Sequence, residues 1–318
     1  MYLVTGGTGF IGKAIVERLV KQKKKVRILT RKTEQIRGVE TVTGDITDRE
    51  VCEKACNGVD VVFHCAGVLG GWGIAKKKFW DVNVTGTKNM LETASKAGVK
   101  KFIHVSSCGI FGPLKEGEIA DEDHMYNPIN IYEKTKIEGE KLVFEYAKKL
   151  PVIIVRPEWV YGPGDLHLIS FFKAVDSGKF VFFNGGKSTL HPTYIDDAVE
   201  GIMLTASNPN AIGHAFNIAG PRPVRIRELI AAMADALGKK IPRISIPGPV
   251  AYMGGLVLDY SFGLFAKPPL SVAQVRYLTE NRAFSYEKAN RVLGYKPKVD
   301  IKQGITRTVE WYKAQSLI

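Results

Sequence analysis

The stretch TGGTGFIG, residues 5–12, decides how the rest of the sequence is interpreted. It follows a short apolar segment, YLVT (2–5), and runs into FIGKAIVERLVKQ (10–22), where apolar residues recur at helical spacing. A glycine-rich turn between a strand and a helix lets backbone N–H groups approach a pyrophosphate, which the helix dipole attracts. We therefore predict a dinucleotide-binding turn. Its expected contacts are Gly6, Gly9, Phe10, Ile11 and Gly12.

Strand-like and helix-like segments alternate through the first half of the chain. Further strands are predicted at 25–30, 39–45, 59–67, 100–107 and 151–157, and further helices at 79–98 and 132–149. The continuous apolar run of VDVVFHCAG is typical of a strand that is buried on both faces. This alternation of strands and helices predicts an α/β fold, a doubly wound parallel sheet of the Rossmann type with helices on both faces.

The second half is divided into shorter elements by glycine and proline. RPEWVYGPGD (156–165) marks the expected boundary between a dinucleotide-binding Rossmann domain, residues 1–165, and a smaller α+β substrate-binding domain, residues 166–318. Residues 190–220 are expected to return to the Rossmann domain. An apolar stretch at 246–270 is broken by glycines and one acid, so it is not a spanning helix. We expect it to pack in the core; the alternatives are a lid on an apolar pocket or a contact with a membrane surface.

Composition is that of a globular protein, with 318 residues, 45% of them hydrophobic and 24% charged. The net charge is +13, but the lysines are dispersed and no nucleic-acid motif accompanies them, so no nucleic-acid partner is expected. Four cysteines lack metal-type spacing, which predicts no metal site and a reducing compartment. Because MYLVTGG leads straight into a strand, we expect no signal peptide, no transmembrane segment and a cytoplasmic location.

Three polar residues are expected to converge at the edge of the dinucleotide site. Tyr132 and Lys136, in YEKTK, are four apart and would share one face of a helix. Ser106 and Ser107 lie at the carboxyl end of a predicted strand, where parallel sheets bind their ligands. A lone Y-x-x-x-K carries little weight in a chain with 12 tyrosines. Its position after the serines is what suggests a catalytic site.

The order of these motifs resembles that of a known enzyme family. The chain is similar to the extended short-chain dehydrogenase/reductase family, also called the NAD-dependent epimerase/dehydratase family. The similarity rests on TGGTGFIG, GDITD (44–48), HCAG (64–67), NVTGT (83–87), VSSCGIFG (105–112), YEKTK and RPEWVYGPGD. YIDDAVEGI (194–202) and FNIAGPRPVRIREL (216–229) extend it. The C-terminal stretch looks more like the 3β-hydroxysteroid dehydrogenase and dihydroflavonol reductase branches.

This resemblance implies Ser107, Tyr132 and Lys136 as the catalytic residues. Lys136 would lower the pKa of Tyr132 and hold the nicotinamide ribose, Tyr132 would transfer a proton to or from the substrate oxygen, and Ser107 would orient that oxygen. Glu133 and Lys134 are expected to face solvent. The remaining expected cofactor contacts are Asp45, Ile46, Ala66, Gly67, Asn83 and Pro157. For Asn83, a hydrogen bond at the start of a helix is an equal alternative.

The second predicted strand indicates which dinucleotide is bound. NAD-binding proteins place a carboxylate at its end, against the ribose 2′-hydroxyl. Here Thr30, Arg31 and Lys32 occupy that position. Two cations would suit a 2′-phosphate, so NADP is preferred over NAD, with Arg31 as the expected contact. The alternative is that Arg31 only faces solvent.

These features support an NAD(P)-dependent oxidoreductase that acts on a small-molecule substrate, at a secondary alcohol or ketone of a ring. The alternatives are a nucleotide-sugar 4-epimerase with tightly bound NAD, and a catalytically silent dinucleotide-sensing module. Sugar 4,6-dehydratases with a similar pattern carry acidic residues just after the serine position. Here Cys108 and Gly109 occupy those positions, which disfavours a dehydration reaction. STLHPTYIDD lacks the arginine that clamps the diphosphate of nucleotide sugars. The candidates to replace it are Arg222, Arg225 and Arg282. A homodimer is expected by resemblance alone, and the sequence does not name the substrate.

Overall fold

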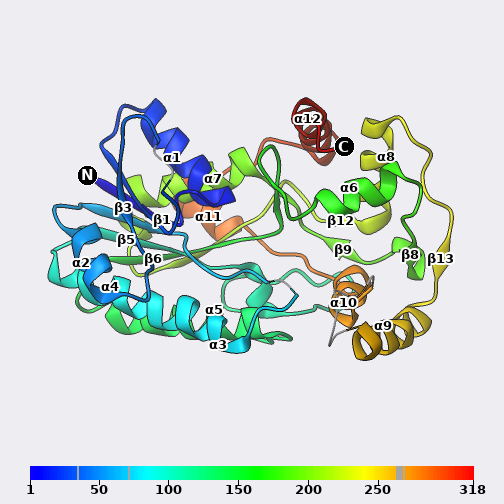
Figure 1. Cartoon of the computed structure of the whole chain (residues 1–318), viewed down its shortest axis with the longest axis horizontal. Helices are drawn as coiled ribbons and strands as arrows, with labels where there is room; N and C mark the ends of the chain where they lie inside the picture. The colour runs from blue at the N-terminus through cyan, green and yellow to red at the C-terminus, as the bar shows by residue number, and fades with distance from the viewer. Residues whose placement is uncertain (34–35, 71, 263–267, 269) are drawn as a thin grey trace.

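The computed structural model describes the chain except for residues 34–35, 71, 263–267 and 269 (Figure 1). Seven parallel strands form one sheet in the order β11-β6-β5-β4-β1-β2-β3. Their bounds are Tyr2–Thr5 (β1), Val26–Thr30 (β2), Val39–Thr43 (β3), Val61–His64 (β4), Lys101–Val105 (β5), Val152–Pro157 (β6) and Ala215–Ile218 (β11). Strand order reverses between β1 and β4, and ligands of such sheets bind at that point. The predicted doubly wound α/β fold is confirmed.

Helices cover both faces of this sheet (Figure 1). One face carries α1 (Phe10–Lys21), α7 (Ile195–Ser207) and α11 (Glu287–Leu293), and the other carries α2 (Arg49–Cys56), α4 (Thr87–Lys96) and α5 (Ile131–Tyr146). Each face has its own apolar core, because neighbouring residues of a strand point to opposite sides. In β6, Ile153 and Val155 join the core under α1 and α7, whereas Val152 and Ile154 join the core under α4 and α5.

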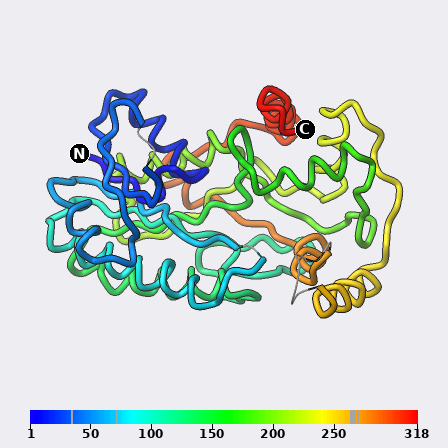
Figure 2. Tube along the Cα trace, viewed as in Figure 1, coloured from blue at the N-terminus to red at the C-terminus, as the bar shows by residue number. Residues whose placement is uncertain are grey.

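The second half of the chain builds the other end of the molecule, as the tube in Figure 2 shows. Its small sheets pair β7 (Val160–Tyr161) with β10 (Thr193–Tyr194), β8 (Phe182–Phe183) with β13 (Ser245–Ile246), and β9 (Thr189–Leu190) with β12 (Val224–Arg225). Its helices are α6 (Ile169–Asp176), α8 (Ile226–Leu237), α9 (Gly248–Phe262), α10 (Val272–Thr279) and α12 (Ile301–Ala314). Within residues 190–220, β11 lies in the main sheet and α7 on its face, but β10 pairs only with β7. The domain boundary at 165 stays a prediction.

The long helix predicted at 79–98 is divided in three. It consists of α3 (Lys76–Trp80), a π-helical turn at Asp81–Gly86, and α4. At the end of that turn, Gly86 lies so close to the side chain of Ile46 that any side chain there would overlap it. The hydroxyl of Thr87 donates a hydrogen bond of 2.7 Å to the carbonyl of Asn83. The turn therefore fixes the position of Asn83, one of the predicted site residues.

The apolar stretch at 246–270 does not pack as predicted. Only Gly248, Ala251 and Gly255 of α9 are buried, whereas Val257 is 60% and Tyr260 87% exposed. Core packing is thus wrong for this helix, because its buried residues are all small and most of its large apolar side chains are exposed. Residues 263–267 and 269 of the stretch lie outside the described residues. Within the described chain, no helix is long and apolar enough to cross a bilayer.

Candidate active site

The glycine turn between β1 and α1 has the shape that a pyrophosphate requires. Gly6 has a φ of +66°, and a side chain on Gly12 would overlap the Gly6 carbonyl oxygen. Gly9 begins α1 without a side-chain cap, and the first helical turn carries no acid. Its N–H groups are therefore not taken by a capping side chain, and the positive end of the helix dipole meets no carboxylate there. The turn fits the phosphates of a dinucleotide.

The ends of β2 and β3 hold the residues expected around the adenosine. Arg31 is exposed, while Asp45 accepts hydrogen bonds of 3.0 Å from the backbone N–H and the hydroxyl of Thr47. Burial raises the pKa of Asp45, but those hydrogen bonds and the charges of Lys78 and Arg31 outweigh it and lower the pKa below its ordinary value. Asp45 is therefore an ionised, fixed acceptor. Ile46 is placed differently, because its side chain packs in the core and only its backbone can face a ligand.

Asn83 connects the loop after β4 with helix α5. Its amide oxygen accepts a 2.7 Å hydrogen bond from the N–H of Val68, and its amide nitrogen donates to the carbonyl of Val68 and to the Thr135 hydroxyl. Its oxygen also lies close to the Cα of Gly67, where a Cβ would come within 3.3 Å of it. Ala66 belongs to the same loop. Asn83 is thus no helix cap. It holds the predicted cofactor-binding loop against α5 at Thr135, the residue before Lys136.

The structure brings Ser107, Tyr132 and Lys136 together. Ser107 follows β5 and caps a short 3-10 helix, Cys108–Phe111, by accepting a 3.1 Å hydrogen bond from Gly109. Ser107 also lies close enough to the Tyr132 side chain to oppose the rise in its pKa. Lys136, only 5% exposed, donates a 2.7 Å hydrogen bond to the carbonyl of Val105, at the end of the same strand. The carboxyl end of β5 and the first turns of α5 therefore form one polar site.

Burial changes the proton affinities of this site. It lowers the pKa of Lys136 to about 8, although the nearby charge of Glu140 acts in the opposite direction. Burial also raises the pKa of Tyr132, with smaller contributions in the same direction from Glu158 and Glu133, while the Ser107 hydrogen bond opposes them. At neutral pH Lys136 is mostly charged and Tyr132 is a neutral phenol. Without a further positive charge, Tyr132 is therefore a proton donor rather than a base.

The expectation that Glu133 faces solvent is wrong. Glu133 is 4% exposed, accepts a 2.6 Å hydrogen bond from the N–H of Ile129, and lies 3.7 Å from the guanidinium of Arg282. Arg282 is itself buried, lies 3.6 Å from Glu280, and stacks over the ring of Tyr277. No local pattern indicates this contact, because Arg282 lies 149 positions after Glu133 in the chain. Lys134, by contrast, is exposed as expected.

Glu158 is a second buried acid that the sequence analysis did not identify as a site residue. It follows Pro157, the last residue of β6, and is 4% exposed. Burial raises its pKa to about 7; the charge of Arg282 opposes this rise and that of Glu133 adds to it. Pro157 is buried within the sheet, paired with Ile218. At this strand end, the side chain near Arg282 and Glu133 is therefore that of Glu158.

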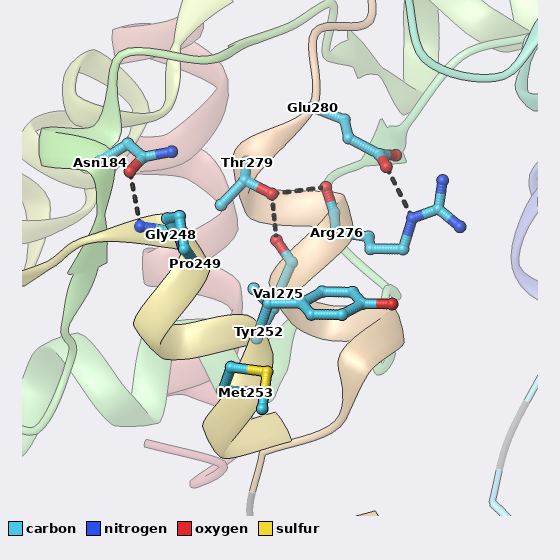
Figure 3. Close-up of a pocket in the computed structure, with 9 residues that line it drawn as sticks. All are labelled: Asn184, Gly248, Pro249, Tyr252, Met253, Val275, Arg276, Thr279 and Glu280. Carbon is cyan, nitrogen blue, oxygen red and sulfur yellow. Dashed lines mark hydrogen bonds and ion pairs between the residues drawn. The ribbon is translucent and has the colours of Figure 1, made fainter. Parts of the chain in front are cut away.

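A pocket of about 420 Å³ opens between α9 and α10 (Figure 3). Tyr252, Met253 and Val275 form its apolar wall, and Arg276 is paired with Glu280 at 2.7 Å on another side. None of the three predicted catalytic residues lines it. Its lining residue Glu280 lies 3.6 Å from Arg282, which in turn lies 3.7 Å from Glu133, the neighbour of Tyr132. The pocket is therefore adjacent to the polar site rather than part of it.

The three arginines considered as diphosphate ligands are placed very differently. Arg222 is exposed and paired with Glu228, and Arg225 is exposed at the end of β12. Arg282 alone is buried near the predicted catalytic residues, and its charge is already shared by Glu133 and Glu280. None of them is positioned as an uncompensated cation beside Tyr132.

Comparison with known proteins agrees with this arrangement. The model of the NAD dependent epimerase/dehydratase family matches residues 2–219. The chain is 30% identical to a 3 beta-hydroxysteroid dehydrogenase/Delta 5-->4-isomerase of Mycobacterium tuberculosis, over 98% of this chain and 90% of the relative. It is 26% identical to N-acetyl-alpha-D-glucosaminyl-diphospho-ditrans,octacis-undecaprenol 4-epimerase of Escherichia coli O157:H7, over 97% and 94% of the two chains.

A solved structure shows the same fold over the whole chain. It is the UDP-glucuronic acid 4-epimerase of Bacillus cereus in complex with NAD, with a TM-score of 0.79 and 24% identity. The alignment covers 100% of this chain and 99% of the other. This likeness extends the agreement in fold over the full length of both chains.

Proposed function

The chain belongs to the NAD dependent epimerase/dehydratase family, and on that basis we propose that it is an NAD(P)-dependent oxidoreductase of the extended short-chain dehydrogenase/reductase type. It would move a hydride to or from a secondary alcohol or ketone on a ring substrate. The relatives of this length include dehydrogenases of ring alcohols, which supports that substrate class.

The convergence of Ser107, Tyr132 and Lys136 is the observation that carries this proposal. When bound, the nicotinamide cofactor supplies the acceptor or donor of the hydride. Tyr132 donates its proton to the oxygen of a ketone, or takes the proton of an alcohol. Ser107 holds the same oxygen by a hydrogen bond and orients it. The charge of Lys136 stabilises the phenolate that forms when Tyr132 has given up its proton.

We propose NADP as the preferred dinucleotide, bound by the glycine turn and by Arg31. Arg31 is exposed at the end of β2, where no carboxylate precedes it in that strand. Asp45, the nearest acid beyond β3, is already engaged by Thr47 and Lys78, which leaves Arg31 as a cation for a 2′-phosphate. Gly67, Ala66 and the backbone of Ile46 would line the same site.

The part of the chain after residue 165 would bind the substrate over the cofactor. It supplies Arg282, Glu280 and Tyr277 to the polar site, although these residues are far from the motifs in sequence. We also propose that the enzyme works in the cytoplasm. A homodimer is proposed on the family resemblance alone.

Absorbance of the reduced nicotinamide tests the function directly. The purified protein would be mixed with NADP or NAD and with ring alcohols, and in the reverse direction with reduced cofactor and ring ketones. We expect a net, substrate-dependent absorbance change, with the Ser107→Ala variant slower by about tenfold or more. If no ring alcohol or ketone gives a net change while a nucleotide sugar is epimerised, the oxidoreductase proposal is wrong.

A 4-epimerase with tightly bound NAD is the second candidate. The undecaprenol-linked 4-epimerase from Escherichia coli matches nearly the whole chain, which favours this candidate. Against it, Arg222 and Arg282 are both paired with glutamates, and the third candidate, Arg225, is exposed at the end of β12. Purification of the protein with one equivalent of NAD that does not exchange would support the epimerase.

A further inference from the structure

Glu158 lies at the strand end that faces the reacting groups. β5 and β6 are parallel neighbours, and Val105 pairs with Val155, so Ser107 lies level with Pro157 and Glu158 follows one residue later. The N–H of Glu158 donates a 3.0 Å hydrogen bond to the carbonyl of Ile218, which fixes its backbone at the edge of the sheet. Glu158 and Ser107 therefore lie just beyond the carboxyl ends of adjacent parallel strands, at the edge of the sheet where ligands bind.

The carboxyl group of Glu158 has no partner in the described part of the chain, and its oxygens are not among the fully enclosed polar atoms there. In the described part of the chain it makes no hydrogen bond and no ion pair within 4.0 Å, although the residue is 4% exposed. Two other buried acids on α5 are bonded: Glu140 binds Arg156 and Tyr126, and Glu133 accepts from Ile129. A bound ligand could supply the hydrogen bond that this carboxyl group lacks within the protein.

The described ionisable groups around Glu158 provide no unpaired positive charge for its carboxylate. Arg282 is shared between Glu133 and Glu280. The other ionisable side chains that face Glu158 are Glu133 and Tyr132 of α5, Cys108 of the 3-10 helix, and Tyr277 of α10. If Glu158 is also ionised, three carboxylates, those of Glu133, Glu158 and Glu280, share the single positive charge of Arg282. An anionic ligand group would be repelled here, whereas an uncharged hydrogen-bonding group would be accepted.

We propose that Glu158 is a substrate-binding residue, whose carboxyl group hydrogen-bonds a second hydroxyl or carbonyl group on the ring, next to the carbon that exchanges the hydride. This inference rests on the proposed oxidoreductase function and narrows its substrate class. The substrate is an uncharged ring with two oxygen functions, such as a cyclic diol or hydroxyketone. A substrate with a carboxylate or phosphate at that position is rejected.

Two substitutions separate hydrogen bonding from packing. Glu158→Leu removes every polar contact, and Glu158→Gln keeps a donor and an acceptor without the charge. The probes are cyclohexanol and the 1,2-, 1,3- and 1,4-cyclohexanediols, with the kcat/KM of each measured in the wild type and both variants. Glu138→Gln, on the exposed side of α5, is the matched control. Circular dichroism melting shows whether each variant is folded.

In the wild type, we expect one diol to be preferred over cyclohexanol. Glu158→Leu should lower kcat/KM for that diol by about tenfold or more and leave cyclohexanol within about twofold, whereas Glu158→Gln should retain part of the preference. Equal losses for all probes, or an unchanged preference in a folded Leu variant, would overturn the role of Glu158. If the wild type oxidises no ring alcohol, the proposed function itself fails, and the inference fails with it.

The pH dependence of alcohol oxidation gives a second readout. A purely structural role of Glu158 would not shift it toward lower pH. A negative charge at Glu158 favours the neutral phenol of Tyr132, so it raises the pKa of that side chain. Removal of the charge in Glu158→Gln should therefore shift the rise of alcohol oxidation with pH toward lower pH. A shift toward higher pH, or none, would contradict a carboxyl group placed beside the reacting oxygen.

Discussion

The two ends of the site are built on different physical principles. The phosphate end uses backbone: Gly6, Gly9 and Gly12 shape a turn, and no side chain caps α1. The reacting end uses buried ionisable side chains that come from β6, α5, α10 and the segment after it. The first depends on eight consecutive residues, while the second depends on contacts between residues more than 100 positions apart. Substitutions at the two ends should therefore have different consequences.

Tyr132→Phe should separate the two ends most sharply. Loss of the hydroxyl removes the proton donor but leaves the glycine turn intact. We expect turnover to fall by roughly 10²-fold or more, with little change in the dissociation constant of the cofactor. Steady-state kinetics and fluorescence titration of the reduced cofactor measure the two quantities. Near-normal turnover in this variant would remove Tyr132 from the chemistry.

Gly12→Ala should have the reverse effect. The added Cβ would overlap the carbonyl of Gly6, so either the turn or α1 must shift. We expect cofactor affinity to fall by about tenfold or more and the melting temperature to drop, because the two elements pack closely there. Gly254→Ala is the matched control, since a Cβ on Gly254 meets nothing within 4 Å. Equal behaviour of the two alanine variants would mean that the turn tolerates a side chain.

Glu133→Gln tests whether the reacting end also stabilises the fold. The amide keeps the size of the side chain but removes the charge that faces Arg282. We expect a loss of about 1–3 kcal/mol in the free energy of unfolding, measured by denaturant titration. Glu138→Gln on the same helix is half-exposed and should cost much less. Similar values for both variants would show that the buried pair adds no stability.

Arg31→Ala should have the smallest effect, confined to the far end of the cofactor. If Arg31 binds a 2′-phosphate, its removal should weaken NADP by about tenfold while NAD changes little, since one charge-assisted hydrogen bond is lost. Lys24→Ala removes the same charge from an exposed position after α1 and serves as the control. An unchanged ratio of the two dissociation constants would contradict the preference for NADP.

The same contrast explains what could be predicted from the sequence. The parallel sheet, the glycine turn and the convergence of Ser107, Tyr132 and Lys136 follow from local patterns and from the rule that ligands bind at the ends of parallel strands. The burial of Glu133 and Glu158 could not be predicted in this way. It depends on Arg282 and α10, which come much later in the chain. The exposed apolar face of α9 was missed because hydropathy alone does not show what covers a helix.

The central claim is net hydride transfer between a ring carbon and a nicotinamide. Incubation of the protein with excess NADP and a ring alcohol deuterated at the carbinol carbon tests it most directly, with mass spectrometry of the released cofactor as the readout. The structure predicts that one deuterium accumulates in the free reduced cofactor and that Tyr132→Phe slows this roughly 10²-fold. Deuterium that stays on the substrate while its stereochemistry inverts would contradict the claim and identify an epimerase.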